Sequence, residues 1–431
     1  MAGWLSLFPP VLPVEVAAQP DQNPFEKHVL ARMKQRVVVI GHGYTSRLGL
    51  TRSLGKAGYA VDVIVVMVEH RKGKIDRTPP VDSYSRYASR VLYCEQDEKQ
   101  LMELLLVQCV EPGRKAVIIP DSDFSAAVID TNQEKLAPYF LFPHIRHTPG
   151  AVVAWMNKKR QKETARKVGL PVAQGVVIEV VDGTYELPTE VPYPCFPKPL
   201  LTLVGAKTGM GRCDTEKELR AAIAAMAERS ATVSVLVEEC LPNQQEYALV
   251  GVSDGTVVHI PGILRIDALA GGGHFGVAKQ GAILPVAGYE TWVERFKAFV
   301  RETGFAGLFD IDFFQSGDQF VFCEMNFRYG GSGYAYTAAG VNLPQQFVTL
   351  MQGAPLDDTQ FIESPSTYIN ERMCVEDWYK GYMTTRAFKA LRKSGDIRFM
   401  ADAEDPLPGR MFDKLVLRKG VRRLVKRCIG K

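Results

Sequence analysis

Residues 36–66 constrain the fold most, because the stretch RVVVIGHGYTSRLGLTRSLGKAGYAVDVIVV reads as a strand, a glycine turn, a helix and a second strand. Its two apolar runs are continuous, as expected of parallel strands covered on both faces. Four such runs are candidate strands of one sheet: 37–40, 61–66, 90–93 and 116–120. With helical spacing at 98–110, the pattern predicts an open parallel α/β domain over residues 35–150, after a proline-punctuated extension at 1–34.

The GHGYTS turn invites a dinucleotide-binding interpretation. However, the third glycine of the GxGxxG pattern is missing. No acidic residue ends the second strand either, since Asp62 lies near its start. We therefore interpret the segment as a tight turn that could lie near a substrate, rather than as an NAD site.

The length of 431 residues exceeds one ordinary core, so two or three domains are expected. A hydrophobic content of 46% and a charged content of 23% are those of a globular protein, and a net charge of +4 does not require a nucleic-acid partner. The eight cysteines show no metal-ligand spacing, and the N-terminal MAGWLSLFPPVLPVEV lacks the pattern of a signal peptide. No window approaches eighteen apolar residues. We expect reduced thiols and a cytoplasmic protein.

Two further segments are expected next, at residues 151–255 and 256–352. A helix at 151–168 leads into the first. Its strand candidates are 175–181, 195–198, 233–238 and 247–253, with the last two paired, and a helix is expected at 215–227. The second is expected to contain helices at 289–303 and 343–351 and strands at 308–314 and 319–325. Residues 353–431 are expected to form a C-terminal cap with a basic tail.

Oxygen donors alternate near the ends of the last two strands. GLFDIDFF places Asp310 and Asp312 on one strand face, and FCEMNFRYGG does the same for Glu324, Asn326 and Arg328. A hairpin would bring Asp312 beside Glu324 and Asn326, a donor set that suits Mg²⁺ or Mn²⁺, while Arg328 suits a phosphate oxygen. Only one of the two aspartates needs to face a metal. An ordinary surface ion pair is the alternative explanation.

A lysine and a glycine-bearing loop precede these strands. Lys198 ends a strand in FPKP, and Gly205, Gly209 and Gly211 follow in the loop 203–211. Glycines let the backbone fold over a polyanion and present N–H groups to it. The spacing is not that of a P-loop, and an ordinary hairpin is the alternative.

The segment VEECL has the groups that a purine needs: an apolar slot, an acceptor and a backbone donor. Glu238 and the backbone of Glu239 and Leu241 could supply them, and Glu246 could bond a ribose hydroxyl. A strand with solvent-facing acids is the alternative explanation.

In order and spacing, these motifs resemble the ATP-grasp superfamily over roughly residues 36–351. EMNFR, which is similar to that family's EMNPR-type motif, is the most specific part, and Lys158 in WMNKKRQ adds to it. The resemblance implies an α/β and α+β architecture in which two subdomains clamp ATP. It also implies roles, with Lys158 and Lys198 on the phosphates, Glu238, Glu239 and Leu241 on adenine, Glu246 on ribose, Asp312, Glu324 and Asn326 on magnesium, and Arg328 on the transferred phosphoryl group.

The segment after Arg328 looks most like the branch of D-aspartate ligase and carbamoyl-phosphate synthase. The resemblance implies that ATP phosphorylates a carboxylate and that an amine then displaces phosphate, giving an amide, ADP and phosphate. An amino-acid ligase acting on a cell-wall precursor is one candidate. Arg265 and Lys279 are candidates for binding the carboxylate substrate, and His274 in GGGHFG is a candidate base. An exposed-strand position without a role in binding is about as common for Arg265 and Lys279, and a lone histidine is more often structural.

Two other functions remain open. A carbamoyl-phosphate-synthase-like or bicarbonate-activating enzyme ranks lower, because the chain has no AMKM-like biotinylation sequence and no amidotransferase segment. A catalytically silent ATP-binding protein has no need of three converging oxygen donors. The basic tail suits an anionic membrane or an anionic carrier, but we favour a solvated helix face. A homo-oligomer is compatible with the sequence.

Overall fold

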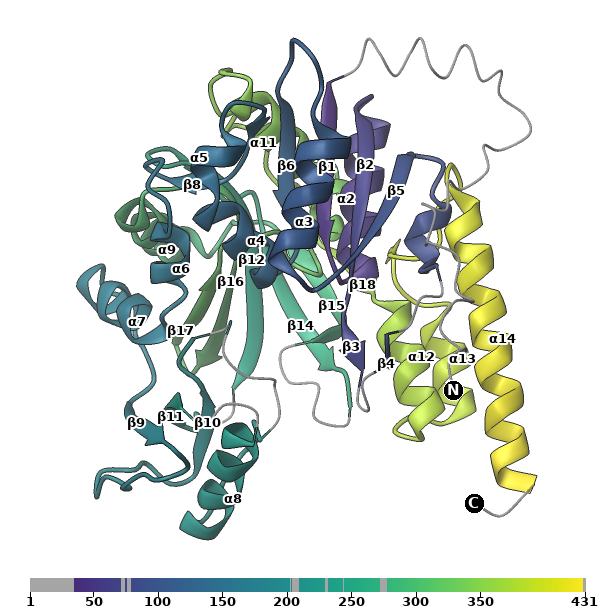
Figure 1. The fold of residues 1–431 in the computed structure, drawn as a ribbon. Coiled ribbons are helices and arrows are strands. Elements are labelled where there is room, and N and C mark those ends of the chain that lie inside the picture. Colours follow the sequence, from purple (N-terminus) through teal and green to yellow (C-terminus); the bar gives the residue numbers. More distant parts are fainter. Residues whose placement is uncertain are drawn as a thin grey trace, which may run out of the picture.

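The structure is a computed structural model that describes residues 35–70, 74–75, 79–201, 203, 209–228, 232–242, 244–271 and 277–428. Its N-terminal part is a five-stranded parallel sheet in the order β5-β2-β1-β6-β7 (Figure 1). The strands are β1 (Arg36–Gly41), β2 (Ala60–Met67), β5 (Ala88–Glu95), β6 (Ala116–Pro120) and β7 (Phe140–Leu141). The four strands expected from the sequence are thus confirmed.

Both faces of this sheet are covered, as its continuous apolar runs predict. Val37 and Val39 pack into one hydrophobic cluster, whereas Val38 and Ile40 pack into another on the opposite face. The helical elements of this part are α2 (Tyr44–Lys56), η1 (Val81–Tyr84), α3 (Glu98–Leu104), η2 (Leu105–Cys109), α4 (Asp123–Thr131) and α5 (Gln133–Leu136). A short hairpin of β3 (Glu69–His70) and β4 (Lys74–Ile75) follows β2.

The helix expected at 151–168 is instead two helices, α6 (Ala151–Trp155) and α7 (Lys158–Lys167). The prediction of one helix is wrong because Asn157 caps a new one: its backbone is extended and its side chain accepts a hydrogen bond from the Arg160 amide. The helical region ends at Gly169, whose φ of 79° suits glycine.

A three-stranded antiparallel sheet follows, in the order β10-β11-β9. It consists of β9 (Gly175–Val181), β10 (Cys195–Pro199) and β11 (Thr232–Glu239), and α8 (Glu216–Ala227) packs against it. Thr215 and Glu218 cap α8 reciprocally. The predicted pairing of 233–238 with 247–253 is wrong, because β9 and β10 already occupy both edges of β11.

The segment 247–253 belongs to β12 (Gln245–Asp254), a central strand of a nine-stranded sheet. The order is β17-β16-β12-β14-β15-β18-β19, with β13 beside β12 and β8 beside β16. The remaining strands are β8 (His144–Ile145), β13 (Val258–His259), β14 (Ile263–Leu269), β15 (Ala278–Leu284), β16 (Phe305–Ser316), β17 (Gln319–Asn326), β18 (Ser366–Ile369) and β19 (Ile397–Arg398).

The long strand β16 separates an aromatic core from the polar face of this sheet. Phe309, Ile311 and Phe313 are buried on one side, where α9 (Glu290–Thr303) packs Phe296 against Phe313 at a ring distance of 4.7 Å. The alternating residues of β16 face the other side, toward the parallel sheet. The helices α10 (Tyr334–Ala338) and α11 (Leu343–Met351) follow β17.

The C-terminal segment joins both earlier parts. β18 and β19 extend the large sheet, and α12 (Glu371–Lys380) lies beside it. The helices α13 (Thr385–Leu391) and α14 (Pro406–Cys428) lie on the outer side of α12 (Figure 1). Arg52 of α2 forms a buried ion pair of 2.9 Å with Asp405. Within the described part of the chain, no helix is both long and apolar enough to cross a membrane.

Candidate ATP and metal site

The β16–β17 hairpin brings the predicted oxygen donors together. Asp312 lies directly opposite Glu324, and Asp310 lies opposite Asn326. The Asn326 Nδ2 atom is 3.4 Å from Asp312 Oδ2. Phe327, the residue that replaces the usual proline, points away into the core, where its ring is 5.1 Å from that of Phe305. The hairpin expected from the sequence is therefore confirmed.

The carboxyl groups on this face lie close together, and the positive charge near them is too small to balance their negative charge. Burial raises the pKa of Asp312 well above its usual value, and the charges of Asp310, Glu324 and Glu246 raise it further. Burial also raises the pKa of Asp310 to about 6, although Arg328 works in the opposite direction. A divalent cation would relieve this repulsion, so the residues fit magnesium.

The donor set is two carboxylates and an amide rather than a complete cage. Among the described residues, no three His, Cys, Asp or Glu side chains are grouped to hold a metal ion. Mg²⁺ is usually held by one or two carboxylates together with water and substrate phosphates. The set Asp312, Glu324 and Asn326 matches that pattern.

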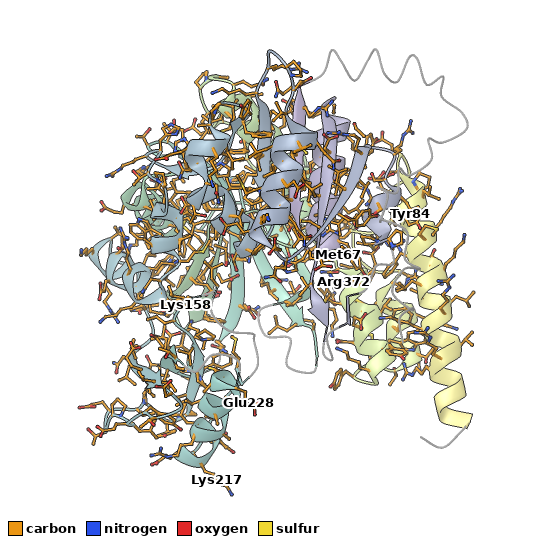
Figure 2. All side chains as sticks on the ribbon, viewed as in Figure 1. Met67, Tyr84, Lys158, Lys217, Glu228 and Arg372 are labelled. Atoms are coloured by element: carbon orange, nitrogen blue, oxygen red, sulfur yellow. The ribbon has the colours of Figure 1, made fainter. Side chains whose placement is uncertain are left out.

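Lys158 is the first residue of α7 and points at this donor set. Its Nζ atom is 3.1 Å from Glu324 Oε2, and only 6% of its side chain is exposed. Figure 2 shows Lys158 between the large sheet and the three-stranded sheet. A buried ammonium beside a metal-site carboxylate is well placed to meet a phosphate once the carboxylate binds a metal.

Lys198 forms a second cationic position, which it shares with Lys162. The Lys198 Nζ atom is 2.6 Å from Glu238 Oε2, and Lys162 pairs with Glu238 Oε1. All three side chains are nearly buried. Burial works to raise the pKa of Glu238, but Lys198 and then Lys162 outweigh it and lower the pKa. Glu238 therefore orients two ammoniums, and its contact with adenine stays a prediction.

Arg328 connects the parallel sheet to the candidate metal-site face, which is the side of the β16–β17 hairpin that carries Asp310, Asp312, Glu324 and Asn326. Its NH1 atom is 3.4 Å from Asp310 Oδ2, and its Nε atom is 3.4 Å from Asp123 Oδ1. Asp123 begins α4, just beyond the C-terminal end of β6. The two carboxylates hold the guanidinium in position from two sides, and neither of them forms a close one-to-one ion pair with it.

Four other residues that were predicted to contact the nucleotide lie in or near the three-stranded sheet and α8. Gly209 has a φ of 81° and packs so tightly that an added Cβ would lie 2.4 Å from the Ala222 carbonyl, so packing alone explains this glycine. Gly211 lies in the turn before α8. Glu239 is the last residue of β11, the central strand of the three-stranded sheet, and its Oε1 accepts from the Gln174 amide at 2.8 Å. Leu241 is half-buried just beyond β11.

Glu246 lies on the face of β12 that also carries Ala248, the neighbour of Asp312 in the adjacent strand. Its charge raises the Asp312 pKa, so it lies close to the metal-site face. A contact with ribose stays a prediction. Gly205 and His274 are outside the described residues.

The two predicted substrate cations have acidic partners. Arg265 pairs with Asp267 of the same strand at 2.6 Å. Lys279 lies 2.7 Å from Asp377 of α12, which also accepts from the Gly271 amide at 2.8 Å. Neither cation contacts the metal-site residues in these interactions, and their role in substrate binding stays a prediction.

Sequence analysis missed Lys162 and Asp123. Lys162 lies one helical turn after Lys158, a spacing that places both on the same face of a helix. Asp123 follows a buried parallel strand at the sheet edge where ligands usually bind. Both features are present in the sequence, but neither identifies a site residue until the partner from another part of the chain is known.

No family model matches the chain. Among curated proteins, it is 25% identical over 219 residues to the carbamoyl phosphate synthase large chain of Gemmatimonas aurantiaca, covering 50% of this chain and 20% of that one. It is 26% identical over 273 residues to the formate-dependent phosphoribosylglycinamide formyltransferase of Anaeromyxobacter dehalogenans, covering 62% and 68%. The similarity thus spans a fifth of the former relative's length and about two thirds of the latter's.

Among solved structures, the chain resembles the biotin carboxylase domain of the 2-oxoglutarate carboxylase of Hydrogenobacter thermophilus, solved with MgADP and bicarbonate. The TM-score is 0.58 at 17% identity, covering 77% of this chain and 73% of that one. It also resembles an L-amino acid ligase from Bacillus licheniformis, with a TM-score of 0.56 at 17% identity and coverage of 78% and 79%. The chain has the ATP-grasp fold, as its motifs predicted.

Proposed function

We propose that this protein is an ATP-dependent carboxylate–amine ligase that works through an acyl phosphate. The observation that carries the proposal is the convergence of Asp312, Glu324 and Asn326 on one face, with Lys158 touching Glu324. Positive charge and oxygen donors in this arrangement suit a nucleoside triphosphate with its metal. The likeness to an L-amino acid ligase supports the amide-forming version.

In this proposal the two cationic positions bind the phosphates of ATP. Lys158 would exchange Glu324 for a phosphate oxygen, and Lys198, oriented by Glu238, would contact a second one. Asp312, Glu324 and Asn326 would hold Mg²⁺ or Mn²⁺, which when bound neutralises charge on the phosphates. Leu241 and the backbone of Glu239 would contact adenine, and Glu246 would contact ribose.

The chemical step is a transfer of the γ-phosphoryl group to the carboxylate substrate. A carboxylate oxygen attacks phosphorus, the bond to the β-phosphate oxygen breaks, and ADP leaves. Arg328 would stabilise the charge of the transferred group from its position between Asp123 and Asp310. The amine then attacks the acyl carbon and loses a proton, and phosphate leaves. Positioning and charge are sufficient, so no protein nucleophile is needed.

The proposal is tested by incubating the purified protein with ATP and MgCl₂ and a panel of carboxylates, each with and without amines. ADP and phosphate, formed only with a suitable carboxylate, are the expected products. Adding hydroxylamine should trap the acyl phosphate as a hydroxamate, and mass spectrometry should identify the amide. Formation of AMP and pyrophosphate would refute this mechanism.

A bicarbonate-activating reaction is the second candidate, favoured by the similarity to a biotin carboxylase domain solved with bicarbonate. It predicts ADP formation that depends on bicarbonate alone. Comparing ATP turnover in bicarbonate-depleted buffer with turnover after bicarbonate is added separates the two reactions. Turnover that needs an organic carboxylate excludes the bicarbonate version.

The described part of the basic C-terminal run belongs to α14. Lys419 pairs with Glu376, and Arg423 donates to the Trp378 carbonyl, so part of this run holds α14 against α12. Binding of an anionic membrane or carrier by the remaining charges, and assembly into a homo-oligomer, remain proposals. The expected unit boundaries at 150, 255 and 352 also remain proposals.

A further inference from the structure

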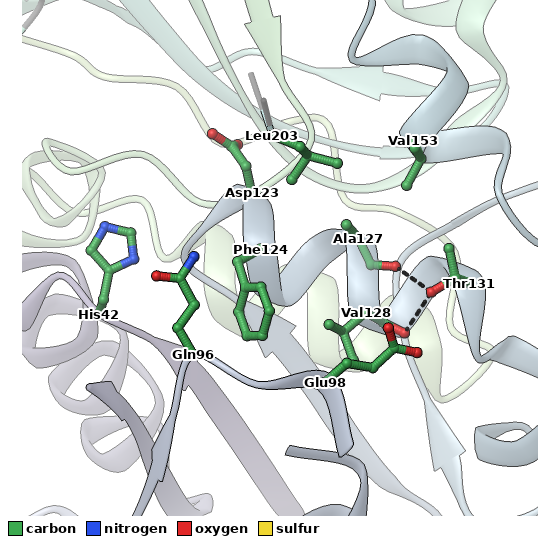
Figure 3. Close-up of a pocket in the computed structure, with 10 residues that line it drawn as sticks. All are labelled: His42, Gln96, Glu98, Asp123, Phe124, Ala127, Val128, Thr131, Val153 and Leu203. Atoms are coloured by element: carbon green, nitrogen blue, oxygen red, sulfur yellow. Dashed lines mark hydrogen bonds between the residues drawn. The ribbon is translucent and has the colours of Figure 1, made fainter. Parts of the chain in front are cut away.

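A pocket at the edge of the parallel sheet is not used by the nucleotide contacts described above. It has a volume of about 460 Å³ and opens beyond the C-terminal ends of β1 and β5 (Figure 3). This volume suits a ligand the size of an amino acid derivative. The lining residues come from the turn after β1, the starts of α3 and α4, α6, and the segment after β10.

The charged residues that line the pocket are acidic, and the Arg328 guanidinium meets one of them, Asp123, from outside the lining. Two carboxylates line it, those of Asp123 and Glu98, and no Lys or Arg is among its described lining residues. Each acid is the first residue of a helix. Glu98 accepts from Asn132 at 2.8 Å, whereas Asp123 Oδ2 accepts no hydrogen bond from the described residues. The Oδ2 atom of this partly exposed carboxyl group is therefore available to an ammonium.

His42 does not add positive charge to the pocket at neutral pH. Desolvation, then the charges of Arg47 and Arg328, lowers its pKa to about 4. The His42 side chain is exposed, and the guanidiniums of Arg47 and Arg328 oppose its protonation. The neutral imidazole can accept a hydrogen bond, so it favours a donor such as an amine.

The remaining wall is apolar and fits a hydrocarbon body. It consists of Phe124, Ala127, Val128, Val153 and Leu203. In Figure 3 the ring of Phe124 and the side chain of Val128 lie beside the polar groups of the pocket. A small apolar side chain would therefore be removed from water when the ligand binds.

The pocket is joined to the site of phosphoryl transfer by Arg328. Asp123 lies 3.4 Å from the Arg328 guanidinium, which in turn lies 3.4 Å from Asp310 of the metal-site face. A ligand group held by Asp123 is thus separated by one side chain, that of Arg328, from Asp310. Of the two acids, Asp123 faces Arg328, whereas Glu98 lies beside Val128 at the other end of the pocket (Figure 3).

We propose that this pocket binds the amine substrate, and that the substrate is a primary amine on an apolar body with no anionic group. Asp123 binds the ammonium, and Phe124 and Val128 pack on the apolar body. This assignment rests on the proposed ligase function for its role, but the binding itself can be measured without turnover.

Calorimetry with three related probes tests the proposal: L-phenylalaninamide, 3-phenylpropionamide, which lacks the amine, and 3-phenylpropionate. We expect L-phenylalaninamide to bind at least about 10-fold more tightly than either of the others, since a charged hydrogen bond contributes about 1.5–3 kcal/mol. Asp123→Asn should remove that preference. Ala127→Trp should block the probe by filling the pocket. Glu134→Gln, an exposed acid outside the pocket, is the matched control.

Tighter binding of the anionic probe, no binding of L-phenylalaninamide, or equal binding to wild type and Ala127→Trp would overturn the assignment. Binding of MgATP is measured in parallel and should be unchanged in Ala127→Trp. If MgATP fails to bind the wild type while the amine probe binds as expected, the ligase function fails but the amine site stands. The two failures are therefore distinguishable.

Discussion

The Lys158 ammonium lies 3.1 Å from a carboxylate oxygen of Glu324, and both belong to the predicted ATP and metal site. Lys158 begins α7, whereas Glu324 lies in β17, far along the chain. The lysine places a positive charge beside this carboxylate. The proposed exchange of the Lys158 partner, from carboxylate to phosphate, is the basis of the first prediction.

Replacing Glu324 with Gln should abolish ATP turnover while the fold survives. The amide keeps the size of the side chain but removes the charge that binds the metal and pairs with Lys158. We expect ADP formation to fall at least about 100-fold, in line with the loss of a main electrostatic contribution. Asn326→Ala should behave in the same way. A coupled ADP assay and thermal unfolding measure both properties.

Glu302→Gln provides the matched control for this test, because Glu302 is exposed on α9 away from the site. It should retain wild-type turnover. Full activity of both Glu324→Gln and Asn326→Ala would remove the metal assignment.

Replacing Lys162 with Met should weaken ATP binding and lower stability. The substitution leaves Glu238 Oε1 buried without its partner, which costs about 1–3 kcal/mol. Lys198 would then pair more strongly with Glu238 and be less available to a phosphate. We expect a rise of about 10-fold in the Kd for MgATP, measured by calorimetry, together with a lower urea midpoint.

The neighbouring Lys159→Met is the control, because Lys159 is exposed on the same helix. Lys162→Arg should restore part of the stability through a new ion pair. An unchanged Kd for MgATP in Lys162→Met would show that Lys162 does not act on the nucleotide.

Much of this site could be predicted from the sequence because its signals are local. Alternation along a strand places Glu324 and Asn326 on one face, and the short turn after Ser316 makes β16 and β17 a hairpin. Continuous apolar runs identify the parallel strands equally well. Each of these patterns can be recognised within a window of about ten residues.

The errors arise where distant segments compete. Strands 233–238 and 247–253 are both apolar and adjacent in sequence, so a local pattern favours a hairpin. Partners elsewhere in the chain determine which sheet each strand joins. β11 pairs with β9 and β10, whereas β12 pairs with β14 and β16. The role of Lys162 was missed for the same reason, since its partner Glu238 lies on a different element.

The break at Asn157 had a local signal that was not used. Asparagine is a strong N-cap residue, and MNKKRQ contains it directly before a run of helix formers. The break also positions the site, since it makes Lys158 the first residue of α7.

Asp121 should make the stability of the protein depend on pH. Burial raises its pKa to about 6, against the opposing effects of Arg47 and of its hydrogen bond from Ser46. The folded state therefore holds a proton that the unfolded state has lost between pH 4 and 6. This contribution to stability is fully present below about pH 4 and is lost as the pH rises through 6.

Asp121→Asn removes this titration, so the variant should gain stability over the wild type at pH 7. A difference of about two pKa units corresponds to about 3 kcal/mol, which is an upper value because the amide does not reproduce every contact. Urea unfolding at pH 4.5 and pH 7.5 measures the effect. The gain should be larger at pH 7.5. A gain that is equal at both values would mean that Asp121 ionises normally in the folded protein.

The buried Arg52–Asp405 ion pair should hold the C-terminal segment on the parallel α/β domain. Asp405 Oδ2 accepts from Arg52 at 2.9 Å and from Ser85 at 2.8 Å, and Oδ1 accepts from the Arg86 amide. Both side chains of the ion pair are at most 1% exposed. Asp405→Asn leaves the arginine charge buried without a counterion, so we expect a loss of about 3–5 kcal/mol in the free energy of unfolding.

Glu404→Gln is the matched control for Asp405→Asn, because Glu404 is the adjacent acid and its side chain is 66% exposed. Its ion pair with Lys56 lies at the surface, where such pairs contribute little, so its unfolding curve should overlay that of the wild type. Hydrogen exchange then locates the effect: in Asp405→Asn, the amides of α12 and β18 should exchange faster than those of the three-stranded sheet. Equal loss of protection in both regions would indicate that the pair stabilises the whole chain rather than the docking of its C-terminal segment.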